Sequence, residues 1–174
     1  ILFEVIKEMI FPSIVNHLSE NGGQNSKMAL ANFFKATDDT RAAIRSNLTN
    51  SIFVPAAIEI LTKFEGTSET LSSIFINGML SHGGGIFKNI LNEIAKDCGL
   101  NEWPSTDIRV EVKKPLFEAC VENVLGKVVG NISTALANFD CDYILLTGRP
   151  SKQPFIRSLF ASSIAINPNR LISL

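Results

Sequence analysis

The sequence predicts an α+β protein that is mostly helical. Apolar residues recur at helical spacing through residues 1–101, and the spacing changes to the alternation of a β-strand at residue 108. From there a strand, a long helix, a second strand and a second helix follow in order. We therefore expect two regions: a helical subdomain over residues 1–101 and a strand–helix–strand–helix region over residues 106–174.

The N-terminal region begins with an amphipathic helix over residues 1–18, whose apolar side chains share one face. Pro12 lies within it and is expected to kink the helix, or to end it and start another. Residues 21–25, rich in glycine and asparagine, predict a turn, and residues 28–36 predict a second helix.

Two further helices are predicted over residues 41–48 and 52–64. Residues 37–40 interrupt the apolar pattern and offer an N-cap for the first of them. Pro55 fits the first turn of the second helix, and Gly66 has the character of its C-cap.

Residues 67–76 leave two alternatives open. A start rich in serine and threonine favours a short helix, whereas the β-branched and aromatic residues 74–76 favour a strand. After a glycine turn over residues 81–85, an amphipathic helix is expected over residues 86–98, and Gly99 closes it.

The C-terminal region contains the strongest periodic signal of the chain. Over residues 108–112 apolar and charged side chains alternate, which predicts a strand with one solvated face. The following helix spans residues 115–138, and its apolar stripe over residues 117–136 is expected to lie in the core.

A buried strand over residues 143–146 is predicted next, followed by a glycine turn over residues 147–151 and a helix over residues 154–161. A helix N-terminus that follows a glycine turn presents backbone amides to a ligand, although such a junction is also a common structural element. Residues 82–85, His-Gly-Gly-Gly, have a similar composition. No clear strand precedes them and no Lys-Ser/Thr pair follows, so we expect a plain inter-helix turn there.

Composition excludes several classes of function. The chain has 174 residues, of which 45% are hydrophobic, and its net charge of −1 is spread along its length. It therefore lacks the basic patch of a protein that binds nucleic acid or an anionic membrane surface. No apolar run reaches the roughly 18 residues that cross a bilayer, so we expect a soluble protein without a membrane partner.

The chain begins at Ile1 inside a helical pattern, so we expect it to be a piece of a longer protein. Cys98, Cys120 and Cys141 are unevenly spaced, which favours reduced thiols in a cytoplasmic compartment. They also lack the paired spacing of a zinc site.

The sequence predicts no catalytic constellation. His17 is expected to be a half-exposed packing residue, and His82 has no identifiable partner. The carboxylates of residues 38–39, and of Asp140 with Asp142, are better explained as helix caps and strand-edge residues than as metal ligands. We therefore expect neither a metal site nor a nucleophile with an oriented base.

The C-terminal region resembles the end of the nucleotide-binding fold shared by actin, the heat-shock chaperone ATPases and the sugar kinases. In that ribonuclease-H-like superfamily, a strand and a long helix with a Phe-Glu pair precede a strand that ends in a glycine turn, and a proline begins the next helix. This chain has Thr147-Gly148 where family members usually have two adjacent glycines. The residues in matching places are Phe117-Glu118, residues 143–146, Gly148, Ser151-Lys152 and Pro154.

A closer resemblance is to the SrfB-type virulence-associated proteins, long bacterial chains with an actin-like ATPase organisation. It is carried by residues 146–151 (Leu-Thr-Gly-Arg-Pro-Ser), Pro154, the Leu159-Phe160 pair and residues 168–172. Residues 1–101 fit, by position only, the helical subdomain that such folds insert between the second phosphate loop and the adenosine loop.

The resemblance implies that this piece contributes the adenosine side of an ATP cleft. The implied nucleotide-binding residues are Thr147, Gly148, Arg149, Ser151 and Lys152, with Lys152 at the position that stacks on adenine in the chaperone ATPases. The implied ligand of the intact protein is ATP with magnesium, and whether that protein is an ATPase stays open. The phosphate loops would precede Ile1, so the piece itself is expected to hold no nucleotide and to be inactive.

The implied partners are the remainder of the same chain and an unidentified protein in the bacterial cytoplasm. An alternative is a helical protein-interaction module with a degenerate, non-binding nucleotide site, in which residues 1–101 offer the partner surface. A free-standing hydrolase is the third option, and the lack of an activated nucleophile argues against it.

Overall fold

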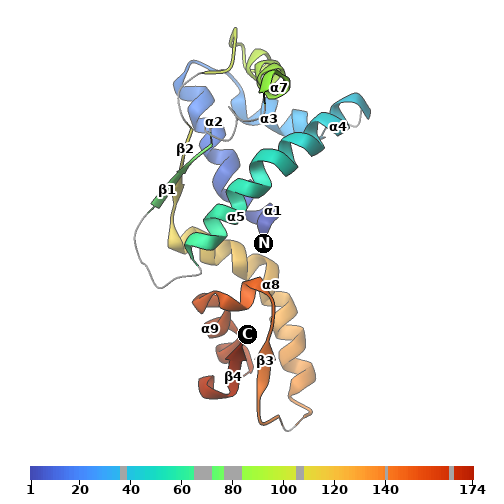
Figure 1. The fold of residues 1–174 in the computed structure, drawn as a ribbon, viewed down its shortest axis with the longest axis vertical. Helices are drawn as coiled ribbons and strands as arrows, with labels where there is room; N and C mark the ends of the chain where they lie inside the picture. Colours follow the sequence, from blue (N-terminus) through green and yellow to red (C-terminus); the bar gives the residue numbers. More distant parts are fainter. Residues whose placement is uncertain (36–38, 65–71, 77–83, 105–107, 140, 165–166) are drawn as a thin grey trace. The chain divides into compact units, whose positions relative to one another are not determined.

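The structure is a computed structural model that describes residues 1–35, 39–64, 72–76, 84–104, 108–139, 141–164 and 167–174. Helices predominate in these residues, and the strands form two small sheets, which confirms the mostly helical α+β class (Figure 1). Several residues discussed above lie outside the described part of the chain: Thr37, Asp38, Gly66, residues 67–70, His82 and Asp140.

The chain folds into two compact units. The N-terminal unit contains residues 2–60 and 71–112, and the C-terminal unit contains residues 61–70 and 113–174, together with residue 1. The division falls after residue 112, whereas the sequence suggested a boundary between residues 101 and 106. The difference arises because the strand that ends at residue 112 pairs with a strand of the N-terminal unit.

The N-terminal unit opens with one continuous helical run: α1 (Leu2–Val5), a π-helical segment (Ile6–Ile10) and α2 (Phe11–Glu20). At the junction the Phe11 amide donates to the Ile6 carbonyl, five residues earlier. Pro12 follows directly, and a proline has no N–H and clashes with the carbonyl four residues before it in a regular helix. The wider π turn accommodates the proline, so the helix continues through Pro12.

The same arrangement recurs at Pro55. A second continuous run consists of α4 (Asp39–Leu48), a π segment (Thr49–Phe53) and α5 (Val54–Lys63), and the Val54 amide donates to the Thr49 carbonyl. Pro55 lies in the first turn of α5, as predicted. The prediction of two separate helices is wrong, because the π segment before the proline keeps the backbone helical.

Aromatic rings connect the helices of the N-terminal unit. Phe34 belongs to α3 (Ser26–Lys35), and its ring centroid lies 4.7 Å from that of Phe11 and 5.8 Å from that of Phe53. Such distances are typical of favourable aromatic pairs. The cluster therefore ties α3 to both π-containing runs.

Helix α7 (Gly84–Asp97) ends as the sequence predicts. Gly99 has a φ of +79°, the Gly99 amide donates to the Lys96 carbonyl, and the Leu100 amide donates to the Ala95 carbonyl. This is the Schellman motif, in which a left-handed residue ends the helix and glycine adopts that conformation without strain. The expected C-cap is confirmed.

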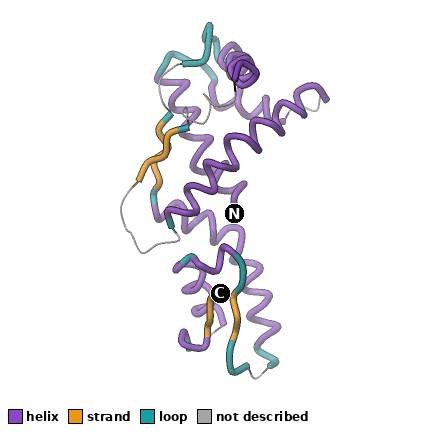
Figure 2. Tube along the Cα trace, in the orientation of Figure 1, coloured by secondary structure: helices purple, strands orange, loops and turns teal. Residues whose placement is uncertain are grey.

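The N-terminal unit also contains one antiparallel sheet, in which β1 (Ser72–Phe75) pairs with β2 (Arg109–Val112) (Figure 2). The strand alternative for residues 67–76 is confirmed in this described part. The two valines of β2 are buried and its two charged residues are exposed. The prediction of a strand with one solvated face is therefore confirmed.

The C-terminal unit contains α8 (Lys114–Leu136), β3 (Ile144–Leu146), α9 (Pro154–Ile164) and β4 (Leu171–Ser173). β3 and β4 pair in parallel, and α9 connects them as a crossover helix. The predicted order of strand, helix, strand and helix is observed from β2 to α9. However, β2 and β3 belong to different sheets, so the βαβ unit is β3–α9–β4.

The apolar stripe of α8 is only partly buried. Phe117, Cys120, Val121 and Val129 are buried, whereas Val128 is 50% and Ile132 is 38% exposed. The expectation that the whole stripe lies in the core is therefore wrong. Within the described residues, α9 packs along α8 and covers one side of it.

β3 is not a buried strand, which corrects the expectation for residues 143–146. Tyr143 is 65% and Leu145 is 58% exposed, while Leu146 is buried. Successive side chains of a strand point to opposite faces of the sheet. The face with Leu146 and Leu171 is buried, and the face with Leu145 is open in the described residues.

His17, expected to be half-exposed, is buried in α2 with 8% of its surface exposed. Burial lowers the pKa of this imidazole below its usual 6.5, because the charged form loses its hydration. Nε2 also has no hydrogen-bond partner in the structure. The folded state therefore favours the neutral imidazole.

This burial predicts a pH-dependent stability. A lowered pKa in the folded state means that stability is retained above about pH 6.5 and declines as the pH falls from there through the lowered pKa. We expect the thermal unfolding midpoint to decrease between about pH 7 and about pH 5, and to decrease less in His17→Gln. Circular dichroism of both proteins measures this, and an equal decrease in both would contradict the assignment to His17.

Candidate functional site

The candidate site is the turn that leaves the carboxyl end of β3. Gly148 has a φ of +92°, a left-handed backbone conformation that residues other than glycine adopt only with strain. Residues Arg149–Lys152 then form a short 3-10 helix, in which the Ser151 amide donates to the Gly148 carbonyl at 3.0 Å. The sequence-predicted glycine turn is therefore present, and its sharp reversal requires Gly148.

The side chain of Ser151 holds this turn together. Its hydroxyl lies 2.6 Å from the Gly148 carbonyl and 3.3 Å from the Leu174 carbonyl, and both are acceptors. The Leu174 amide in turn donates to the Leu146 carbonyl at 3.0 Å. Ser151 is only 6% exposed, so its hydroxyl does not face solvent. Its contacts with the two carbonyls join the turn to the end of β4.

Gln153, directly before α9, is a second residue that positions the turn. It is 2% exposed, and its Nε2 donates to the Leu61 carbonyl at 2.8 Å. Leu61 lies in the last turn of α5, and its carbonyl also accepts from the Phe64 amide at 3.1 Å. Gln153 is a second donor to this carbonyl and thereby fixes the start of α9 against the last turn of α5.

Aromatic stacking supports the same part of the C-terminal unit. The rings of Phe64 and Phe117 are stacked with centroids 4.1 Å apart and an interplanar angle of 15°. Phe117, which belongs to the Phe-Glu pair of the resemblance, is buried. Phe64, directly after α5, is thus held on α8 by the ring stack, and Leu61 in the last turn of α5 is held by Gln153.

The structure brings the five predicted site residues into one short turn. Thr147, Gly148 and Lys152 are exposed, so they are accessible to a ligand. Arg149 lies in the same 3-10 turn. Ser151 is the exception, because its hydroxyl is engaged within the protein. Chemically, the turn offers accessible backbone and the exposed cation of Lys152 at the carboxyl end of a parallel strand, which is where open α/β sheets bind ligands.

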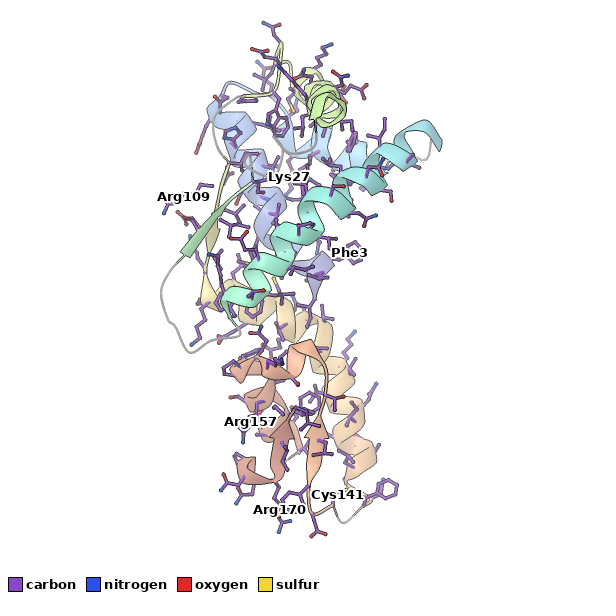
Figure 3. All side chains as sticks on the ribbon, viewed as in Figure 1. Phe3, Lys27, Arg109, Cys141, Arg157 and Arg170 are labelled. Atoms are coloured by element: carbon purple, nitrogen blue, oxygen red, sulfur yellow. The ribbon has the colours of Figure 1, made fainter. Side chains whose placement is uncertain are left out.

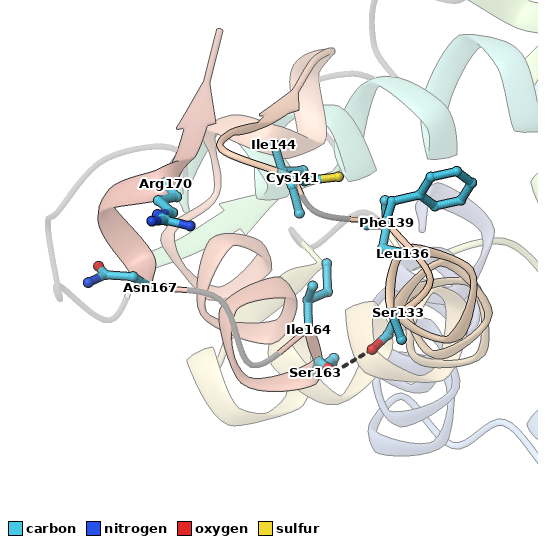
Figure 4. Close-up of a pocket in the computed structure, with 10 residues that line it drawn as sticks. Ser133, Leu136, Phe139, Cys141, Ile144, Ser163, Ile164, Asn167 and Arg170 are labelled. Carbon is cyan, nitrogen blue, oxygen red and sulfur yellow. Dashed lines mark hydrogen bonds between the residues drawn. The ribbon is translucent and has the colours of Figure 1, made fainter.

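A pocket of about 540 Å³ lies elsewhere in the C-terminal unit (Figure 4). It is formed by the end of α8, the residues that lead into β3, the end of α9 and the residues that lead into β4. None of the predicted site residues lines it. The pocket therefore lies at the amino end of the parallel strands, while the Gly148 turn lies at their carboxyl end.

Three features of the C-terminal unit were not predicted from the sequence: Ser151 as a positioning residue, Gln153 as a link to Leu61 of α5, and the pocket. Pro154 marks the start of α9 in the sequence, but glutamine is not a usual N-cap residue, so no local signal marks Gln153. Its partner, Leu61, is 92 residues away in sequence, and no local pattern indicates it.

Three further features of the described residues concern metal ions, thiols and membranes. No group of three or more His, Cys, Asp or Glu side chains there is arranged to hold a metal ion. All three cysteines are free thiols, and burial raises the pKa of the Cys98 thiol. Among the described helices, none combines the length and the apolar character needed to span a membrane.

Comparison with known proteins places the chain in a described family. The model of the family described as Virulence factor SrfB matches residues 1–174, which is the whole chain. No curated protein and no solved structure matches.

The role of Ser151 leads to a stability prediction. The buried Ser151 hydroxyl has one proton, which the Gly148 and Leu174 carbonyls share. Ser151→Ala removes this donor, so we expect it to lower the free energy of unfolding by about 1–2 kcal/mol. Ser158→Ala is the matched control, because that exposed hydroxyl donates to the Pro154 carbonyl of its own helix. Its expected change is within about 0.5 kcal/mol. Urea denaturation compares the two, and equal effects would contradict the assigned role.

Proposed function

This chain belongs to the SrfB family of virulence factors, and we propose that it forms the adenosine-side edge of an ATP-binding cleft in an actin-like domain. The observation that carries the proposal is the Gly148 turn, with its φ of +92°, at the carboxyl end of β3. The N-terminal unit, in this proposal, is part of a helical subdomain next to the nucleotide domain.

The topology of the C-terminal unit supports a nucleotide edge. β3, the turn, α9 and β4 form a parallel βαβ unit, and such units bind ligands outside the carboxyl ends of their strands. Gly148 removes the side chain at the point of closest approach, and Thr147 and Lys152 are exposed on either side of it. A lysine stacks favourably on an aromatic face, so Lys152 suits the purine ring.

The small size and the open face of the β3–β4 sheet support the same assignment. Two strands alone are marginally stable, and parallel sheets are normally covered on both faces. Here Leu145 and Ile172 are neighbours on the open face, and Tyr143 and Leu174 are exposed as well. An edge of this kind fits a larger sheet, so the proposed partner of this face is the remainder of the same SrfB chain.

Phosphate and magnesium binding are assigned to other parts of the intact protein. The Gly148 turn has no Lys-Ser/Thr pair of a phosphate loop and no neighbouring carboxylate group for a metal in the described residues. Phosphoryl transfer depends on positioned metal ions and charge stabilisation. In this proposal the chain binds the nucleoside and leaves any hydrolysis to groups outside it.

Titration of the intact SrfB protein with ATP and magnesium tests the proposal. Gly148→Val is expected to weaken ATP binding by about tenfold, because a side chain blocks the backbone approach and strains the turn. Gly22→Val is a matched control, since Gly22 has a nearly equal φ of +93° in the N-terminal unit. Both variants carry a similar backbone strain of about 1–2 kcal/mol.

The outcomes separate the candidate functions. Saturable binding that weakens in Gly148→Val and is retained in Gly22→Val supports the nucleotide edge. Absence of binding at millimolar ATP would contradict the nucleotide edge, and the helical protein-interaction module would remain as the candidate function. If ATP binding weakens equally in Gly148→Val and Gly22→Val, the cause is lost stability, and this result would also contradict the proposal.

A second prediction concerns Lys152. Replacing it with alanine removes the proposed stacking cation, so we expect ATP affinity to fall by about three- to tenfold. Lys127→Ala is the control, because Lys127 is an exposed lysine on α8 of the same unit. Isothermal titration calorimetry measures both, and an unchanged affinity in Lys152→Ala would exclude a role for this side chain.

A further inference from the structure

We propose that the pocket at the amino end of β3 and β4 binds a small molecule with an apolar body and one carboxylate, which pairs with Arg170. This site is separate from the Gly148 turn. The inference does not depend on nucleotide binding.

The pocket has the size and lining of a small-molecule site. Its volume of about 540 Å³ lies within the range of such sites, roughly 300–1,000 Å³. Leu136 from α8, Ile144 from β3 and Ile164 from α9 are half-buried in its wall. Figure 4 shows these apolar side chains on one side of the hollow and Arg170 on the other.

A direct hydrogen bond links the two helices that line the pocket. The Ser133 hydroxyl of α8 donates to the Ser163 carbonyl of α9 at 2.5 Å (Figure 4). This bond satisfies a carbonyl at the end of α9 and holds the helices together. The apolar wall is therefore pre-formed, as in most small-molecule sites.

The charge of the lining selects an anion. Arg170 is the only charged residue among the described residues that line the pocket, and none of them is acidic. A guanidinium binds a carboxylate through two parallel hydrogen bonds. The mixture of one cation and an apolar wall therefore matches an amphipathic monocarboxylate.

Arg170 is presented by an ordered turn. The Arg170 amide donates to the Asn167 carbonyl at 2.8 Å, and the Asn169 amide donates to the Asn167 side-chain oxygen at 3.0 Å. Arg157 of α9 donates to the Pro168 carbonyl at 2.9 Å, and Figure 3 shows Arg157 and Arg170 in the same unit. These bonds fix the backbone that carries the guanidinium, which reduces the entropy lost on binding.

Cys141 provides a reporter inside the pocket. Its thiol belongs to the lining and is partly exposed, whereas Cys98 and Cys120 are buried. A neutral thiol reagent such as N-ethylmaleimide should therefore modify Cys141 in the folded protein. A ligand in the pocket should protect it.

The experiment measures N-ethylmaleimide modification of Cys141 in the intact protein by peptide mass spectrometry. Octanoate is compared with octan-1-ol, which has the same chain length and no charge. We expect saturating octanoate to slow modification by about fivefold through occupancy of the pocket. Arg170→Gln should weaken protection by octanoate by about tenfold and leave the weaker effect of octan-1-ol unchanged.

Lys127→Gln is the matched control, because it removes an exposed cation of the same unit that does not line the pocket. Retained protection in Lys127→Gln, together with its loss in Arg170→Gln, supports the proposal. The proposal is overturned if octanoate does not protect Cys141, if octan-1-ol protects equally well, or if Arg170→Gln binds octanoate as the native protein does.

Discussion

The hydroxyl of Ser151 connects the two backbone segments on which the C-terminal unit depends. It reaches the carbonyl of Gly148 in the turn after β3 and the carbonyl of Leu174 after β4. Two short parallel strands are marginal on their own, because few ladder hydrogen bonds oppose the entropy of ordering them. A buried hydroxyl that bonds both strand ends therefore stabilises the pairing and the left-handed turn together. The exposed parts of the turn, Thr147 and Lys152, are positioned by this internal bond.

Local patterns predicted the elements whose cause is itself local. Gly99 ends α7 because a left-handed residue is needed there, and this requirement is visible in the sequence. The alternation over residues 108–112 likewise predicted both the strand β2 and its solvated face. The continuous helices around Pro12 and Pro55 were harder to predict, because a proline usually ends a helix. The π segments that keep both helices continuous have no sequence signature of their own.

Other features could not be predicted, because they depend on residues that are distant in sequence. The apolar stripe of α8 indicates which face avoids water, but it does not state how much of that face is covered, and Val128 is exposed. The glycine turn was identified from a strand followed by glycine and proline, while the bond from Gln153 to Leu61 was not. The pocket was missed for the same reason, since four separate segments contribute its wall. The resemblance to the SrfB family, carried by the C-terminal residues, agrees with a family match that covers the whole chain.

The two ends of β3 offer different chemistry, and the central claim concerns the carboxyl end. Hydrogen–deuterium exchange of the intact SrfB protein, with and without ATP and magnesium, tests this claim most directly because it reports on individual backbone amides. The account predicts that the nucleotide slows exchange in residues 147–153, with no change around Gly22 in the N-terminal unit. Saturating nucleotide that protects other segments and leaves residues 147–153 unchanged would contradict the account.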